Sequence, residues 1–587
     1  MKLNEMEVLT LDCQATGANP QKGHLLEIGW VRTSAAASIK LETLDVSADR
    51  VALPADVDIP PAVQRVTGIT RADASAALPA ADIWQKLTRT ARQVADRDQM
   101  EKCPIVIHYS RFEKAFLEHL HAQQDRSDVF PFNIICTHEI AKRLLPGLPR
   151  RGLRAVAGYF GHSVPPQRRS GAHAVATAVI WQHFVQQLTD DHGVENLDQV
   201  TEWLKGTAPQ TRTGRDYPMK PDIRLNLPDK PGIYRMLRSN GDLLYIGKAT
   251  SLKQRVNSYF RQKGNHAEHT LEMLSQAADL AVTRTGSALE AAVLESDEIK
   301  RHCPPYNVAL QTGQRELAFC SRDLQKCALK PDASYCIGPL PAGLTTTAMN
   351  AFAGWHKDPE RRTDDFLQNT YDILGLPPAY APEPDCLAEG LALFQHNHRT
   401  RLKNPSALRI VTGLGHRLWA ERLKAMAEAK LAAAEGTDEE VPDEALEESE
   451  EEPSWTPEAV ARGIELAIMR TALLVRRARW LCLLSESSLA WATRNAKDHY
   501  KHVLLFKNGN VSAREKLAAK KETPLSAGYT KRIPDRQTIF DVATYERLRV
   551  VTTELRRLVG EDRKIELRLS PMGILTGRQL ARLLPWV

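Results

Sequence analysis

Pro231-Gly232-Ile233-Tyr234 and Leu244-Tyr245-Ile246-Gly247-Lys248 are the stretches that decide the fold of the central part of this chain. They belong to two apolar runs, residues 232–237 and 243–247, on either side of Ser239-Asn240-Gly241-Asp242. Asn-Gly between two apolar runs is the strongest short-range hairpin signal, and it predicts a type I′ turn with two positive φ angles. A β-hairpin is therefore expected here.

Two helices are predicted to follow the hairpin. The pattern over residues 251–261 places Leu252, Val256 and Tyr259 on one face. The second helix covers residues 287–302 and ends before Pro304-Pro305, because proline cannot continue a helix. The compact αβ unit carries a polar set that is unusual for a core: Tyr234, Tyr245, Lys248, Arg255 and Glu295.

Residues 227–310 resemble the GIY-YIG endonuclease domain, in the form carried by UvrC, a subunit of bacterial excinuclease, and by its shorter homologue Cho. The resemblance rests on an ordered set of motifs: Gly232-Ile233-Tyr234, Tyr245-Ile246-Gly247-Lys248, Leu252-x-x-Arg255-x-x-Ser258-Tyr259, the helix at 290–300, and Pro305-Tyr306-Asn307-Val308. It implies a metal-dependent enzyme that hydrolyses a DNA phosphodiester.

The resemblance also implies roles for individual side chains. Glu295 falls on the position that holds one divalent ion, Mg²⁺ or Mn²⁺, which needs only one carboxylate plus water and substrate phosphate. Arg255 would face the scissile phosphate. Tyr234 and Tyr245 would flank the attacking water, and the choice of general base between them stays open. The remaining matched positions line or brace the site: Lys248, Tyr259 and Asn307.

Each of these residues also has an ordinary structural interpretation when taken alone. Tyrosines are favoured in strands, and an acid on an exposed helix face needs no function. The catalytic hypothesis depends on the complete set occurring in order.

Composition describes an ordinary soluble protein. The 587 residues predict three to four domains, with 43% hydrophobic and 26% charged residues. The net charge is +6, although residues 435–452 contain many acids and no Lys or Arg, so the rest of the chain is more basic. This balance favours DNA as a partner, and the acidic run is either a competitor for the basic surface or a solvated linker.

No membrane or secretory segment is expected. The start of the chain lacks an apolar signal region, and no apolar run approaches the roughly 18 residues of a membrane span. The nine cysteines favour a reducing bacterial cytosol over a disulfide framework. We expect Cys320, Cys327 and Cys336 to be buried thiols, with metal binding as the less favoured alternative.

The N-terminal region predicts an RNase-H-like α/β layer. Its strands are expected at residues 8–12, 25–30 and 104–108, and its helices near Phe112, at 137–145 and at 171–187. The region resembles the DEDDh proofreading exonuclease domain of DNA polymerase III epsilon. The matching stretches are Asp12-Cys13-Gln14-Ala15-Thr16-Gly17, His108-Tyr109-Ser110-Arg111-Phe112-Glu113 and Arg168-Arg169-Ser170-Gly171-Ala172-His173-Ala174.

The resemblance implies four acids around two metals, and this chain keeps only Asp12 and Glu113. Gln14 replaces one acid, His173 stands at the last acid position, and Arg168 stands where the base belongs. Two negative charges with an added positive one should not hold two divalent ions, so we predict a retained fold without exonuclease activity. Whether Arg168 and Arg169 contact DNA phosphate or form a helix-surface pair stays open.

The predicted architecture is α/β and multidomain, with an RNase-H-like exonuclease fold, a small αβ GIY-YIG domain and a mainly helical C-terminal region. The expected parts are an exonuclease-like domain at 1–190, a helix and semi-flexible linker at 191–225, the nuclease domain at 226–312, a mixed to helical extension resembling UvrC or Cho at 313–433, an acidic disordered linker at 434–456, and helices with terminal strands at 457–587. The helix predicted at 457–485 interleaves arginines with apolar residues. It is a core or partner-facing helix, or, as the alternative, a DNA-binding one.

Three functions follow as hypotheses. The leading one is a structure- or lesion-directed DNA endonuclease that makes a single incision in repair, because no second nuclease set occurs in the C-terminal part. A damage-recognition complex containing a UvrB-like helicase is its expected partner. The alternatives are a 3′→5′ DNA exonuclease and a non-catalytic DNA-binding protein.

Overall fold

The computed structural model describes the chain except for residues 37–43, 75–76, 125–128, 210–213, 262–265, 308–315, 325, 331, 333, 342–381, 400–405, 436–454, 493–499, 527–539 and 562–563. It forms two compact units. One contains Met1–Ala291 and Arg301–Ala309, and the other contains Ala292–Lys300 and Leu310–Val587. Nearly all of the acidic run at 435–452 and the residues from 348 to 381 lie outside the described part.

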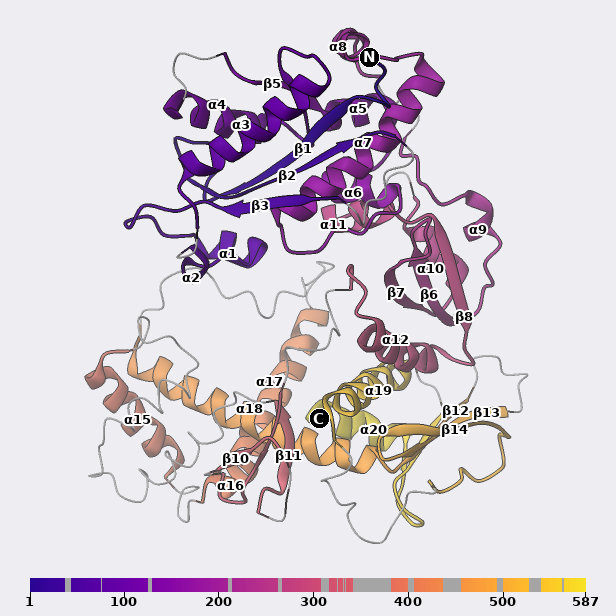
Figure 1. Cartoon of the computed structure of the whole chain (residues 1–587). Helices are drawn as coiled ribbons and strands as arrows, with labels where there is room; N and C mark the ends of the chain where they lie inside the picture. The colour runs from indigo at the N-terminus through magenta and orange to yellow at the C-terminus, as the bar shows by residue number, and fades with distance from the viewer. Residues whose placement is uncertain are drawn as a thin grey trace. The chain divides into compact units, whose positions relative to one another are not determined.

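The N-terminal domain is built on a five-stranded mixed sheet of order β3-β2-β1-β4-β5. Its strands are β1 (Glu7–Ala15), β2 (Leu25–Ser34), β3 (Val46–Arg50), β4 (Cys103–Ile107) and β5 (Phe132–Cys136). Its helices are α1 (Pro61–Thr67), α2 (Arg71–Ala74), α3 (Ala80–Arg97), α4 (Arg111–Gln124), α5 (Thr137–Leu144), α6 (Leu153–Tyr159), α7 (Ser170–His192) and α8 (Leu197–Lys205). The predicted α/β layer is confirmed (Figure 1).

The central strand β1 is buried on both faces of the sheet. Leu9 and Leu11 pack with α3 and α4 on one face, whereas Val8 packs with α5, α6 and α7 on the other. The alternation follows from the two-residue repeat of a strand. Since β1 and β4 are parallel neighbours, with Leu11 opposite Ile107, Asp12 emerges at the carboxyl edge level with the end of β4.

The central αβ domain contains the predicted hairpin in a three-stranded antiparallel sheet of order β7-β6-β8. The elements are α9 (Pro221–Leu225), β6 (Gly232–Leu237), β7 (Leu243–Ala249), α10 (Leu252–Ser258), α11 (Glu268–Leu274), β8 (Asp279–Arg284) and α12 (Ala288–His302). The hairpin and both flanking helices are confirmed.

The turn between β6 and β7 is not the predicted type I′ turn. Gly241 has a φ of 88°, whereas Asn240 keeps a negative φ, and the Gly241 N–H donates to the Arg238 carbonyl at 3.0 Å. The strand register shifts at Leu237, as in hairpins that close with a left-handed glycine. The Asn240 side chain donates to the Gly161 carbonyl at 2.7 Å, so tertiary contact holds this residue.

The first unit joins the N-terminal and central domains through α6 and α11. Arg150 bonds Glu268 on α11, and the Arg150 main-chain N–H donates to the Ser275 hydroxyl at 2.9 Å. One turn later, Arg154 pairs with Glu272 at 3.6 Å. The two domains are therefore connected by opposite charges as well as by the chain.

Residues 214–225 pack against the central domain, so this part of the expected linker is not a free tether. The Tyr217 ring meets Phe260 edge-on, with 4.9 Å between centroids. Arg224 on α9 donates to the Asn257 side chain at 2.7 Å and lies over the Phe260 ring.

The second unit contains two sheets. The smaller one has the order β10-β9-β11, with β9 (Leu317–Cys320), β10 (Cys327–Ala328) and β11 (Ile337–Pro341). The larger one has the order β14-β13-β12-β15-β16, with β12 (Ser488–Ala492), β13 (Tyr500–Lys507), β14 (Asn510–Ala518), β15 (Ile565–Arg568) and β16 (Ile574–Thr576). The strands β12 to β14 were not anticipated from the sequence.

Helices form the rest of the second unit. They are α15 (Pro384–His398), α16 (Ala407–Arg409), the π-helical turn η3 (Ile410–Gly415), α17 (His416–Glu435), α18 (Pro457–Leu484), α19 (Val542–Gly560), α20 (Gly577–Leu583) and the 3₁₀ turn η5 (Leu584–Trp586). One apolar core joins α15, η3 and α18. Within the described residues, no helix is long and apolar enough to cross a membrane.

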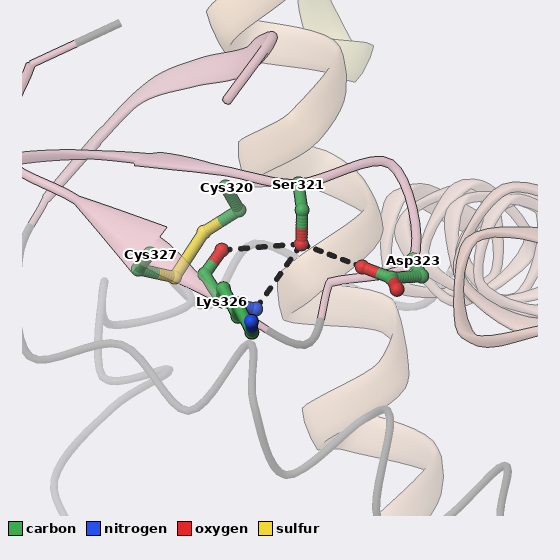
Figure 2. Close-up of a disulfide and its surroundings, with 5 residues drawn as sticks. All are labelled: Cys320, Ser321, Asp323, Lys326 and Cys327. Atoms are coloured by element: carbon green, nitrogen blue, oxygen red, sulfur yellow. Dashed lines mark hydrogen bonds between the residues drawn. A yellow bond between two sulfur atoms is a disulfide. The ribbon is translucent and has the colours of Figure 1, made fainter. Parts of the chain in front are cut away.

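The expectation of three reduced thiols in this region is wrong for two of them. Cys320 and Cys327 form a disulfide, shown in Figure 2. Antiparallel pairing of β9 with β10 places these residues directly opposite each other, with Cα atoms 4.3 Å apart. Cys336 is half-buried and lies outside this disulfide.

Candidate active site

Three predicted site residues of the central domain are joined by hydrogen bonds. The Tyr234 hydroxyl on β6 lies 2.9 Å from the Tyr259 hydroxyl at the end of α10. Arg255, one turn earlier on α10, donates to the Tyr259 hydroxyl at 3.2 Å and lies over its ring, 5.0 Å from the centroid. The exposed guanidinium is thus held in place by a buried pair of phenols.

Tyr234 and Arg255 differ in their charge at neutral pH, and their surroundings shift the two pKa values. Burial raises the pKa of Tyr234 well above its ordinary value, and Tyr259 and Tyr245 add to the effect. Burial alone would lower the pKa of Arg255, but the neighbouring tyrosines raise it. Tyr234 is therefore a neutral hydroxyl at neutral pH, beside a permanent cation.

Gly247 makes room for the Tyr234 ring. A Cβ atom at position 247 would lie 2.4 Å from the Tyr234 hydroxyl and 2.8 Å from the Tyr245 ring. No larger residue fits this space without moving both rings, so the glycine of the second tripeptide is required by packing.

The other two predicted site residues of the hairpin, Tyr245 and Lys248, lie on β7. Tyr245 is half-buried, and its ring centroid is 6.1 Å from that of Tyr234. Lys248 is exposed. The hairpin therefore presents one buried tyrosine, one accessible tyrosine and one exposed cation on adjacent strands.

Asn307 braces the same hairpin from outside the sheet. Its side-chain oxygen accepts the Ile246 N–H, and its side-chain nitrogen donates to the Ile246 carbonyl, both at 2.9 Å. The neighbouring Tyr306 hydroxyl donates to Glu272 at 2.6 Å. These contacts fix the strand that carries Tyr245.

In the N-terminal domain, the structure brings together four of the five predicted residues of the exonuclease-like site. One oxygen of the Asp12 carboxylate lies 3.2 Å from His173 Nδ1, and the other accepts from the Gln14 amide at 2.8 Å. Glu113 is buried beside them, and burial followed by the charge of Asp12 raises its pKa well above the ordinary value. Both oxygens of Asp12 are thus engaged by protein groups.

Arg168 and Arg169 differ in their contacts and in their exposure. Arg169 is bound to the buried Glu27 through Nε, which lies 3.0 and 3.2 Å from the two carboxylate oxygens. Glu27 also accepts from the Ser170 main-chain N–H at 2.7 Å. Arg169 is therefore a structural residue, whereas the Arg168 side chain is exposed.

Two family models match this chain. Residues 230–308 match the UvrC-like GIY-YIG domain, and residues 9–169 match the exonuclease family. The chain carries a UvrC-like GIY-YIG domain behind an N-terminal exonuclease-family domain. The predicted recognition of both domains is confirmed.

Relatives with curated names match about one sixth of this chain. The UvrABC system protein C of Psychrobacter sp. (strain PRwf-1) is 48% identical over 98 residues, which are 16% of each chain. The protein of the same name from Moorella thermoacetica is 48% identical over 85 residues, or 14% of each chain. The matched region thus spans about one sixth of the relatives' length.

Solved structures match both domains. The GIY-YIG N-terminal endonuclease domain of UvrC from Thermotoga maritima, bound to magnesium, is 34% identical and is covered completely by 15% of this chain, with a TM-score of 0.14. Exonuclease X in complex with 5′ overhanging duplex DNA is 18% identical and is covered to 99% by 34% of this chain, with a TM-score of 0.24.

The UvrC-like domain offers a suitable donor for a hard divalent ion in Glu295, a half-exposed carboxylate on α12. The helix α12 is divided between the two compact units: its residues 292–300, which include Glu295, belong to the second unit. Among the described residues, no group of three or more His, Cys, Asp or Glu side chains is arranged to hold a metal. A single carboxylate such as Glu295 suits an ion that takes most of its ligands from water and substrate phosphate.

The exonuclease-family domain does not fit a pair of metal ions. Gln14 and His173 contact the Asp12 carboxylate, and Glu113 is the other acid buried beside it. Two carboxylates provide only half of the negative charge that balances two divalent cations.

The structure adds one residue that the sequence did not indicate. His266 Nε2 lies 2.9 Å from the Tyr259 carbonyl, and its ring stacks on the Tyr259 ring with centroids 6.1 Å apart. No local pattern marks this histidine, because the contact depends on the return of the chain after α10.

Proposed function

We propose that this chain is a metal-dependent DNA endonuclease that makes a single incision beside a lesion or distorted structure during DNA repair. The arrangement of Tyr234, Tyr259 and Arg255 supports this proposal most directly. A guanidinium held by buried phenols, on a surface next to an accessible tyrosine, is suited to bind and polarise a phosphodiester.

Arg255 binds the scissile phosphate in this proposal. Its fork of N–H donors matches two phosphate oxygens, and its position on the Tyr259 ring limits its rotation. A preorganised cation stabilises the charge that develops on the oxygens without reorganisation during the reaction. Lys248 adds a second exposed positive charge on β7.

Tyr245 is our candidate for the residue that takes a proton from the attacking water. Tyr234 is fully buried and has a raised pKa, so it retains its proton. Tyr245 is half-buried and therefore accessible to water. Tyr234 then serves to position Tyr259 and, through it, Arg255.

Glu295 would hold the divalent ion, Mg²⁺ or Mn²⁺. When bound, such an ion polarises the phosphate and lowers the pKa of a coordinated water. The solved Thermotoga UvrC domain carries magnesium, which supports the choice of ion.

The exonuclease-family domain acts without catalysis in this proposal. Both oxygens of the Asp12 carboxylate in this domain contact protein groups, namely the side chains of Gln14 and His173. The domain contributes to DNA binding or to domain placement instead. The names of the relatives, UvrABC system protein C, support a damage-recognition complex with a UvrB-like helicase as the partner that delivers DNA.

Incision of a duplex with one site-specific lesion tests the proposal. Wild-type protein with Mg²⁺ or Mn²⁺, alone and with a UvrB-like helicase, should produce one nick on a denaturing gel. Glu295→Gln and Arg255→Ala should each reduce the rate at least about 100-fold, as expected when a transition-state contact is lost.

Matched controls make the test specific. Lys253→Ala removes an exposed cation from the same helix as Arg255 and should leave the rate unchanged. Stepwise degradation of a labelled strand that is lost in Asp12→Ala but kept in Glu295→Gln would replace this proposal with an exonuclease. Salt-dependent DNA binding without any cleavage would indicate a binding protein.

A further inference from the structure

A pocket of about 520 Å³ lies in the second unit. It is lined by residues of segments far apart in the sequence, namely β11, η3, α18 and the C-terminal helix α20. Its volume is within the range of pockets that hold small organic molecules.

Much of the pocket lining is apolar. Ile337, Val475, Leu483 and Leu569 line it together with a small part of Trp480, which is 3% exposed. The Trp480 ring is fixed, because its N–H donates to the Thr552 hydroxyl on α19 at 3.0 Å. A rigid aromatic ring beside aliphatic side chains suits a flat apolar body.

The polar part of the wall is positive. Arg476 and Arg479 on α18 line the pocket, and the described residues around it include no Asp or Glu. Burial lowers the pKa of Arg476, and burial followed by the charge of Arg476 lowers the pKa of His416, which also lines the pocket. Arg476 therefore lies where water is partly excluded, so its attraction for a bound anion is stronger than at an open surface.

Three further arginines lie on α18 and α19, within one turn of Trp480 or of its hydrogen-bond partner Thr552. Arg477 precedes Trp480 by one turn on α18, and Arg549 and Arg556 lie one turn on either side of Thr552 on α19. Burial and the charge of Arg549 lower the pKa of Arg477. Arg556 donates to the main-chain oxygens of Leu584 and Val587. No Asp or Glu among the described residues forms an ion pair with Arg477 or Arg549, so these two arginines add positive potential near Trp480.

We propose that this pocket is a nucleotide-binding site that holds a base among its apolar side chains, at the edge of Trp480, and a phosphate at Arg476 and Arg479. Apolar contact with the base and a guanidinium–phosphate contact together bind a nucleotide without reading its sequence. The occupant is either a free nucleotide or an unpaired nucleotide of a DNA strand, and the two share this chemistry. The inference goes beyond the proposed incision and does not depend on it.

Calorimetric titration of the full chain, with divalent metal chelated, tests the proposal. The probes are deoxynucleoside monophosphates, the matching deoxynucleosides, inorganic phosphate, decanoate, a single-stranded oligonucleotide and its duplex. The monophosphates should bind more tightly than the nucleosides and more tightly than phosphate alone. Preference for the single strand over both the duplex and the monophosphates would identify DNA as the source, and the reverse order would identify a free nucleotide.

Three variants localise the binding. Arg476→Ala combined with Arg479→Ala should weaken monophosphate binding by about 100-fold, since each charge-assisted contact is worth about tenfold. Arg470→Ala, on the same helix but exposed and outside the pocket, should have no effect. Thr412→Trp fills the pocket without changing its charge and should also abolish binding.

Chemical protection gives a second measurement on unmodified protein. Cys336 lines the pocket and lies outside the Cys320–Cys327 disulfide, so a bound monophosphate should slow its reaction with a maleimide, as mapped by mass spectrometry. Exposed Cys303 should react at an unchanged rate. Absence of protection, or binding of decanoate or phosphate as tight as that of the monophosphates, would overturn the proposal. So would normal affinity in the Arg476→Ala, Arg479→Ala double variant or in Thr412→Trp. Incision by wild-type protein, measured in parallel, remains a separate result.

Discussion

The side chain of Asn307 forms two hydrogen bonds with the main chain of Ile246, one to the N–H and one to the carbonyl, each at 2.9 Å. Asn307 lies 61 residues further along the chain, yet it acts as an additional strand partner for β7 at this point. Because Ile246 is fully buried between Tyr245 and Gly247, no water replaces this partner.

Asn307→Ala should therefore destabilise the domain by about 1–3 kcal/mol, because two buried main-chain groups lose their partners. Incision should fall more than thermal stability alone explains, since Tyr245 loses its support. Thermal unfolding followed by circular dichroism, with incision measured well below the unfolding transition, separates the two effects. An active variant with lowered stability would show that Asn307 is only structural.

Tyr234→Phe should change the alkaline stability of the protein. Burial raises the pKa of Tyr234 above its ordinary value of 10.0, so the folded state keeps a proton that the unfolded chain loses above this pH. The contribution of Tyr234 to the free energy of unfolding is therefore fully present below pH 10 and is lost as the pH rises further. The phenylalanine variant should lose less stability between pH 9 and 11, as measured by urea unfolding; an identical pH slope would contradict the burial argument.

Glu113→Gln should stabilise the protein at neutral pH. Burial and Asp12 raise the pKa of Glu113 above the ordinary 4.5, so the group favours folding at low pH and this contribution is lost as the pH rises through the folded-state value. The gain in melting temperature should be clear at pH 8 and small at pH 4.5. Glu118→Gln, a half-exposed acid on the same helix, is the control.

Addition of Mg²⁺ or Mn²⁺ to these same proteins tests the exonuclease-like cluster. If Asp12 and Glu113 bound metal in the folded state, either ion would raise the wild-type melting temperature more than that of Glu113→Gln. We expect equal shifts, because Gln14 and His173 already occupy the Asp12 carboxylate.

Arg154 should couple the N-terminal domain to the UvrC-like domain. Its guanidinium lies 3.6 Å from Glu272 and 5.7 Å from the centroid of the Tyr306 ring. A double-mutant cycle of Arg154→Ala and Glu272→Ala should give a coupling free energy of about 0.5–1 kcal/mol for this partly exposed pair. Arg92→Ala on α3 is a control for loss of charge. A coupling of zero would mean that the two domains do not use this contact in solution.

The hairpin, its helices and the α/β layer were predictable because their signals are local. Alternating apolar residues, Asn-Gly and the Pro304-Pro305 stop act within a few residues of each other. The turn type was not predictable, since Asn240 is held by the Gly161 carbonyl, 79 residues away. The Cys320–Cys327 disulfide was missed for a similar reason, because only the β9–β10 register places the sulfur atoms together.

The sequence by itself determined which residue types are present at each site: the ordered tyrosines, Arg255 and Glu295, and the replacement of acids by Gln14 and His173. These identities follow from the chain alone. Only the tertiary structure decided how they act. Burial makes Tyr234 a neutral brace, the contact with Tyr259 orients Arg255, and hydrogen bonds close the Asp12 cluster, since pKa values and partners depend on surroundings that come from distant parts of the chain.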